Sequence, residues 1–141
     1  MQRLDPFVRD LPDPERGRLR LTRWIEKLTS GETALAQLES VPLLGRTLAL
    51  LLATSAEVCD VLARNPEMGL SCLDLDTGYA LASVARVREE ARRLTAHAVS
   101  YSHRLDRLRF LKDKHTVVLA MADVGGFVPP REVWGGISSL A

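Results

Sequence analysis

Paired carboxylates are the first residues of this 141-residue sequence that could do chemistry. Asp74 and Asp76 stand two positions apart, shortly after Gly69 and Ser71. Two such carboxylates can hold Mg²⁺ at the phosphates of a nucleotide. Residues i and i+2 share a face only on a β-strand, however, and the pattern around these residues indicates none. We therefore interpret residues 74–78 as a solvated polar loop and predict no metal site there.

Histidines and cysteines do not form a second candidate site. Zinc ligands paired on a helix need i,i+4 spacing, which no two of the histidines have; these are His97, His103 and His115. His115 stands among leucines, so we expect it at the edge of the core. Cys59 and Cys72 lack metal-type spacing and are interpreted as reduced thiols of a cytoplasmic protein. We predict no catalytic residue in this chain.

Several basic residues follow one another closely from Arg104 to Lys114. Four of them are candidates for binding an acidic partner, namely Arg104, Arg107, Arg109 and Lys112. Such a partner could be another domain or a bound phosphate. Carboxylates are interleaved with these residues, so the alternative is a solvated face with ion pairs. Aromatic residues make up only 5%, which leaves few rings for stacking bases, so single-stranded nucleic acid is not expected.

Charge and hydropathy exclude several classes of protein. The formal net charge is +1, so no overall field favours nucleic acid. The N-terminus has mixed charge and no apolar core of the kind found in signal peptides. No apolar run is longer than that of residues 48–53, which is too short to cross a bilayer. We expect a protein that binds neither nucleic acid nor membrane.

Helical periodicity dominates the chain and predicts an all-α fold, an irregular multi-helix bundle. Hydrophobic residues make up 46% and are mostly Leu, Ala and Val, a balance in which the strong helix formers Leu and Ala favour helices. Residues 79–124 predict one long helix, or two helices broken near Ser100, that Gly125 and Gly126 end. Apolar residues at three- and four-residue spacing predict the core, which includes Leu48, Leu51, Leu52, Val58, Leu62, Leu81, Val84, Leu108, Leu111 and Val118.

Proline and glycine suggest how the chain is organised. Pro6 and Pro12 oppose regular structure, which predicts a flexible N-terminal arm over residues 1–12. Asp13 and Pro14 are typical of a helix start, so we expect a helical domain over residues 13–141. Its last part, residues 127–141, has weak helix propensity and is interpreted as a connector. Its apolar residues predict an exposed patch around Trp134, Ile137 and Leu140.

The stretch from Arg104 to Gly126 resembles the bifunctional glutamine synthetase adenylyltransferases, also called adenylyl-removing enzymes. That family carries a leucine, basic residues and an alanine-rich helix ending in Asp-Leu-Leu-Gly. The matching positions are Leu108-Arg109, Lys112, Lys114, Leu119-Ala120, Asp123 and Gly126. Two further stretches are similar to the family, Ile137-Ser138-Ser139-Leu140-Ala141 and the positions Ser55, Leu62, Arg64 and Pro66-Glu67. The chain departs from the family at His115, Val118 and Ala122, where the family often has polar residues.

The resemblance implies a non-catalytic helical scaffold that precedes the first nucleotidyltransferase domain. Such an enzyme regulates nitrogen assimilation by adding AMP to glutamine synthetase and removing it, and uses ATP and Mg²⁺. The implied partners are a downstream nucleotidyltransferase domain and glutamine synthetase, and the resemblance implies that residues 127–141 are a connector toward that catalytic domain. The family's catalytic Gly-Ser and Asp-x-Asp motifs lie beyond the matched stretch, so we expect an isolated chain to be inactive and to bind no cofactor. The alternative is a self-standing helical protein-interaction module without enzymatic activity.

Overall fold

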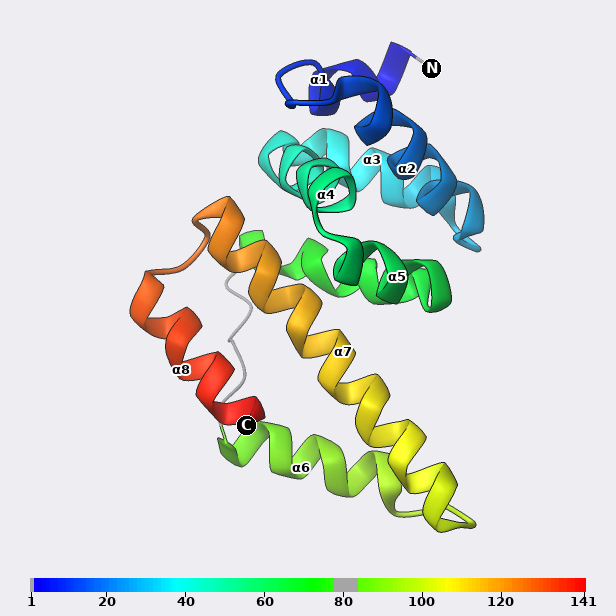
Figure 1. Ribbon diagram of the computed structural model, residues 1–141, viewed down its shortest axis with the longest axis vertical. Helices are drawn as coiled ribbons and strands as arrows, with labels where there is room; N and C mark the ends of the chain where they lie inside the picture. The colour runs from blue at the N-terminus through cyan, green and yellow to red at the C-terminus, as the bar shows by residue number, and fades with distance from the viewer. Residues whose placement is uncertain (1, 78–83) are drawn as a thin grey trace. The chain divides into compact units, whose positions relative to one another are not determined.

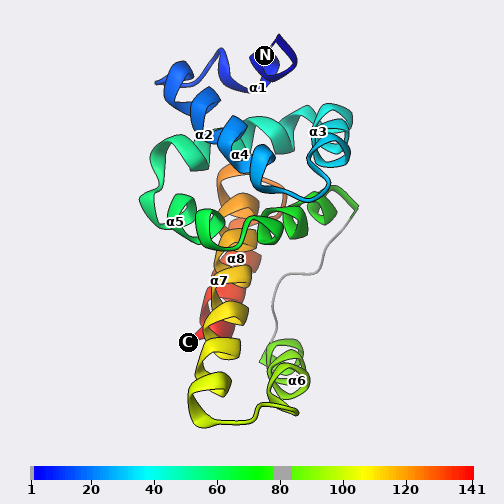
Figure 2. The same ribbon diagram turned by 90° about the vertical axis from the view of Figure 1, so that its right-hand side faces the viewer.

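The protein is helical, as the computed structural model in Figures 1 and 2 shows. The structure describes residues 2–77 and 84–141, and these form α-helices and two 3₁₀ segments without a β-strand. The prediction of an all-α fold is confirmed. The chain divides into two compact units, residues 1–79 and 80–141, which are described separately below.

The first unit contains five α-helices and two 3₁₀ segments among its described residues. These are η1 (Gln2–Leu4), α1 (Asp5–Val8), α2 (Pro14–Lys27), α3 (Gly31–Ser40), α4 (Pro42–Thr54), α5 (Ala56–Arg64) and η2 (Pro66–Thr77). Local signals set two of the starts. The side chain of Asp13 accepts a hydrogen bond from the backbone N–H of Arg16 at 3.0 Å, and that of Ser55 accepts one from Val58 at 3.2 Å. Both residues act as N-caps, which satisfy N–H groups that have no partner within the helix.

Helix α4 forms the centre of the first unit. It packs against α1, α2, α3, α5 and η2. Its buried residues lie around much of its circumference and include Leu44, Gly45, Leu48, Ala49, Leu51 and Leu52. Gly45 lies against the ring of Phe7, where an added Cβ would be 2.5 Å from a ring carbon. A helix that is apolar on most sides is stable only when neighbouring helices cover it. Leu48, Leu51 and Leu52 are all buried, so the prediction of their burial is confirmed.

The N-terminal segment is regular, so the prediction that Pro6 prevents regular structure there is wrong. Pro6 lies in the first turn of α1, where the N–H that proline lacks has no partner in any case. Phe7 and Val8 are buried. Arg3 donates to both carboxylate oxygens of Glu39, at 2.7 and 2.8 Å, and to Glu32 at 2.9 Å. Buried apolar side chains and this forked ion pair therefore hold residues 2–8 against the rest of the unit.

The second unit contains three helices among its described residues. These are α6 (Val84–Thr95), α7 (Tyr101–Gly125) and α8 (Pro130–Leu140). Of the two predicted alternatives, the structure has two helices broken near Ser100, and the Ser100 side chain caps α7 by accepting from His103 N–H at 3.1 Å. Gly126 ends α7 with a φ of 65°, the left-handed conformation that favours glycine. Figures 1 and 2 show α8 beside the second half of α7.

The core of the second unit is built on the C-terminal half of α7. Its buried residues there are Leu111, His115, Val117, Val118, Leu119, Met121 and Ala122. Leu108 was predicted to be buried and is 42% exposed, so that prediction is wrong. Periodicity identifies the face of a helix but not how far along it the neighbouring helices reach, and no residue from Tyr101 to Phe110 is buried. The predicted burial of Val58, Leu62, Leu111 and Val118 is confirmed, whereas the side chains of Leu81 and Val84 lie outside the described residues.

None of the described helices is by itself both long and apolar enough to cross a bilayer. Helices α3 and α4 together have the length and composition of a span, but the chain bends by 117° between them.

Candidate functional site

The four basic residues singled out in the sequence all lie on α7 and are exposed. Arg104 and Arg107 are neighbours on the helix surface, but Arg109 lies roughly 140° around the axis from Arg104. Arg107 donates to the ring of His103 at 3.3 Å, and Arg109 pairs with Asp106 at 3.3 Å. The ion pair between Arg109 and Asp106 is largely exposed, so it contributes at most about 1 kcal/mol to the stability of the protein. The four cations do not gather into one patch, and their binding of an acidic partner stays a prediction.

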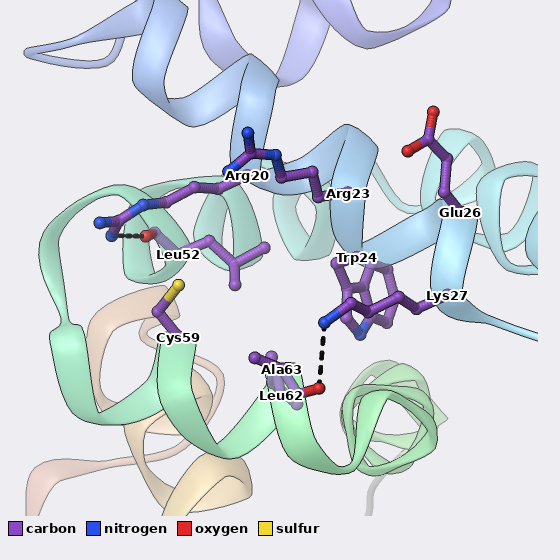
Figure 3. Close-up of a pocket in the computed structure, with 9 residues that line it drawn as sticks. All are labelled: Arg20, Arg23, Trp24, Glu26, Lys27, Leu52, Cys59, Leu62 and Ala63. Carbon is purple, nitrogen blue, oxygen red and sulfur yellow. Dashed lines mark hydrogen bonds between the residues drawn. The ribbon is translucent and has the colours of Figure 1, made fainter.

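A different group of cations lines a pocket in the first unit (Figure 3). The pocket has a volume of about 410 Å³ and lies between α2 and the C-terminal ends of α4 and α5. Arg20, Arg23 and Lys27 line it from α2, at spacings of three and four residues. That spacing, on the face of α2 that Leu21 does not occupy, is the sequence signal that could have identified them. Figure 3 shows the carboxylate of Glu26 pointing away from these side chains.

Two of these cations already have structural roles. Arg20 donates to the carbonyl oxygen of Leu52 at 2.6 Å, and Lys27 donates to that of Ala63 at 3.1 Å. Both carbonyls lie in the last turn of a helix, where C=O groups lack helical partners and carry partial negative charge. The half-buried free thiol of Cys59 faces the same space. The arrangement therefore holds α2 to α4 and α5, and its positive charge would suit an anionic group better than a cationic one.

A carboxylate of the second unit joins α6 to α7. Glu90 accepts a hydrogen bond from Lys114 Nζ at 2.7 Å, and its other oxygen lies 3.0 Å from His115 Nε2. The side chains of Glu90 and His115 are 15% and 1% exposed. Burial alone would raise the pKa of Glu90, but the hydrogen bonds from Lys114 and His115 together outweigh burial and hold this pKa below its usual value. The burial of His115 agrees with the sequence prediction, whereas its carboxylate partner was not predicted.

A groove of about 420 Å³ lies between α7 and α8 and is mostly apolar. Helix α7 contributes Lys112, Thr116, Leu119, Ala120 and Asp123, and α8 contributes Val133, Ile137 and Leu140, with Ala141 after it. Close contact between the helices depends on Gly136, because a Cβ there would lie 2.5 Å from a methyl carbon of Leu119. Trp134 and Ile137 are 73% and 55% exposed, so the predicted exposed apolar patch is confirmed at these two residues, whereas Leu140 is half-buried.

The carboxylates considered first as metal ligands fall in η2. The side chains of Cys72, Asp74 and Asp76 lie outside the described residues. Across the part of the chain that the structure describes, no three His, Cys, Asp or Glu side chains gather as they would around a metal ion. No residue is therefore assigned to Mg²⁺ or to a nucleotide.

Comparison with known proteins identifies the family. The family model described as glutamate-ammonia ligase adenylyltransferase matches residues 45–141, which run from within α4 to the end of α8. The chain therefore belongs to the glutamate-ammonia ligase adenylyltransferase family, and the resemblance predicted from the sequence is confirmed.

One curated relative matches nearly the whole chain. It is the bifunctional glutamine synthetase adenylyltransferase/adenylyl-removing enzyme of Mycobacterium marinum, to which the chain is 32% identical over 143 aligned residues. The alignment covers 99% of this chain and 14% of the relative, so the chain spans about one seventh of the length of that enzyme. No solved structure matches the chain.

Proposed function

We propose that this chain is a non-catalytic helical scaffold of an adenylyltransferase/adenylyl-removing enzyme that acts on glutamine synthetase. In that role it regulates nitrogen assimilation as part of an enzyme that adds and removes AMP. The observation that carries the proposal is the family match, which covers, at least in part, four of the five longest α-helices among the described residues. The whole enzyme would use ATP and Mg²⁺ in the cytoplasm and would have glutamine synthetase and its own nucleotidyltransferase domain as partners.

The roles of the buried polar groups support a scaffold. Thr47 and His115 are the buried polar side chains among the described residues. The hydroxyl of Thr47 donates to the carbonyl of Leu43 at 2.8 Å, and His115 is joined to Glu90. The polar group of each of these side chains is therefore bonded to another residue of the same unit. Catalytic groups more often have a perturbed side chain facing an open cleft, where it can reach a substrate.

An assay of the purified chain tests the non-catalytic part of the proposal. The chain is supplied with ATP, Mg²⁺ and glutamine synthetase in its unmodified and adenylylated forms, and AMP transfer and release are measured. We expect neither reaction. Removal of AMP that is lost in Asp74→Ala but kept in Asp60→Ala, a matched change at an exposed carboxylate of α5, would overturn the proposal and assign Asp74 a catalytic role.

The second candidate function is a self-standing helical module that binds another protein. The exposed side chains of Trp134 and Ile137 on α8 favour it, because apolar side chains of this size gathered on a surface often mark an interface. The two functions predict different results when this chain replaces the matching region of the relative. Only a scaffold should replace the matching region of the Mycobacterium marinum enzyme without loss of activity.

A further inference from the structure

On the α7 side, the groove between α7 and α8 is lined by evenly spaced residues, which are charged at the two ends and uncharged in the middle. The lining residues of α7 follow the spacing i, i+4, i+7, i+8 and i+11 from Lys112 to Asp123, so they form one straight stripe along the helix. Its middle holds the small side chains of Thr116 and Ala120, which allow another helix to approach closely, and the larger side chain of Leu119. The two ends of the stripe are charged and lie roughly 16 Å apart along the axis.

The charges at the two ends are opposite and exposed. Lys112 stands at one end and Asp123 at the other, and neither makes an ion pair within the described part of the chain. A helix laid in the groove parallel to α7 and carrying the same stripe would bring like charges together at both ends. The same helix laid antiparallel would bring opposite charges together at both ends. The stripe is therefore self-complementary in the antiparallel direction only.

We propose that this groove is where two copies of the chain associate, with the two α7 helices antiparallel across a two-fold axis. An axis at the level of residues 117–118 places Lys112 opposite the partner's Asp123, and repeats that pair by symmetry. The same axis places Thr116 opposite the partner's Leu119, so a small side chain meets a large one. A two-fold interface requires one surface to complement itself in this way.

The exposed apolar residues of α8 extend the same surface. Ile137 lines the groove, and Trp134 lies one turn before it on α8. Association would bury both side chains, which are more than half exposed in the single chain. The contact is centred on one groove, so we expect a dissociation constant on the order of micromolar, as for other small interfaces. This inference does not depend on the proposed enzymatic role.

Sedimentation equilibrium of the full chain, from about 1 to 100 μM, tests the proposal. Lys112→Glu and Asp123→Lys should each raise the dimer dissociation constant by at least about tenfold, because two symmetric pairs turn from attraction to repulsion. The double variant should restore the constant to within about threefold of the wild-type value, since it exchanges the charges of both pairs. Arg93→Glu is the matched control, an exposed charge reversal on α6 outside the groove, and should leave the constant unchanged.

Tryptophan fluorescence provides a second readout. The chain has two tryptophans; Trp24 is 3% exposed and should emit at constant wavelength, so a blue shift with concentration reports on Trp134. Circular dichroism melting checks that each variant is folded. A wild-type chain that stays monomeric with unshifted emission would overturn the proposal and leave the groove to a different polypeptide. Failure of the folded double variant to regain the dimer would overturn the antiparallel pairing.

Discussion

Glu90 of α6 and His115 of α7 are joined by a contact of 3.0 Å between Oε2 and Nε2, inside the core of the second unit. Lys114 reaches the other oxygen of the same carboxylate at 2.7 Å. Two consecutive residues of α7 therefore converge on one side chain of α6. The cluster fixes the register between the two helices as well as linking them, because a shift by one residue would separate all three groups.

Removal of the Glu90 charge should destabilise the protein. We expect Glu90→Gln to lower the free energy of unfolding by about 1–3 kcal/mol, because Lys114 and the buried ring of His115 lose a charged hydrogen-bond acceptor. Glu89→Gln makes the same chemical change at the neighbouring exposed position and should cost less than about 0.5 kcal/mol. Urea unfolding followed by circular dichroism measures both values. Equal effects of the two variants would show that the cluster adds no stability.

The same carboxylate should make stability sensitive to acid. The pKa of Glu90 is lowered in the folded protein, so its contribution is fully present above the unfolded pKa of about 4.3 and is lost as pH falls through the folded value. Below about pH 4.3 the wild-type free energy of unfolding should therefore fall more steeply with acid than that of Glu90→Gln. Unfolding curves measured at several pH values compare the two slopes. Parallel slopes for the two proteins would contradict the lowered pKa.

Two adjacent glycines of α8 should respond in opposite ways to alanine. A Cβ built on Gly135 would meet no atom within 4 Å apart from its chain neighbours and the backbone of its own helix, so Gly135→Ala should raise stability by about 0.5–1 kcal/mol through helix propensity alone. The Cβ of Gly136→Ala would instead meet Leu119 at 2.5 Å. Overpacking of this kind costs about 1–3 kcal/mol, so this variant should be the less stable of the two. Thermal melting ranks them, and the reverse order would mean that α8 does not pack on Leu119.

Leucine-to-alanine changes on α7 test where its buried face begins. Leu111→Ala should cost about 2–5 kcal/mol, because the side chain is 3% exposed and its loss leaves a cavity. Leu108→Ala should cost less than about 1 kcal/mol, because that side chain is 42% exposed. Chemical denaturation of both variants gives the comparison. A large loss of unfolding free energy in Leu108→Ala would show that the buried face of α7 extends to Leu108, as periodicity predicts.

The sequence predicts the helices and most of the core because these depend on local signals. Ser55, Ser100 and Gly126 act as helix ends through short-range geometry, and the spacing of Leu111 and Val118 identifies a buried face. The burial of Leu108 and the lack of regular structure around Pro6 were predicted wrongly. Both depend on which distant residues pack against these positions. Arg3, for example, is held by Glu39, which is 36 residues away.

The candidate sites were less predictable for the same reason. The four basic residues of α7 could be listed from the sequence, but helix geometry spreads them around the axis. The pocket formed by Arg20 and Lys27 depends on carbonyls of Leu52 and Ala63, which are more than 30 residues away in the chain. The contact between Glu90 and His115 likewise joins two helices. The apolar patch on α8 was predicted correctly because a run of large apolar residues at the end of a helical pattern is visible without a partner.

Activity of a chimera tests the scaffold proposal most directly. In the Mycobacterium marinum relative, the region aligned with this chain is replaced by residues 1–141, and addition and removal of AMP on glutamine synthetase are measured with ATP and Mg²⁺. We predict that the chimera keeps both activities and that Glu90→Gln within it lowers its thermal stability more than Glu89→Gln does. A chimera that is folded and binds ATP but neither adds nor removes AMP would contradict the proposal that this chain is an interchangeable scaffold of that enzyme.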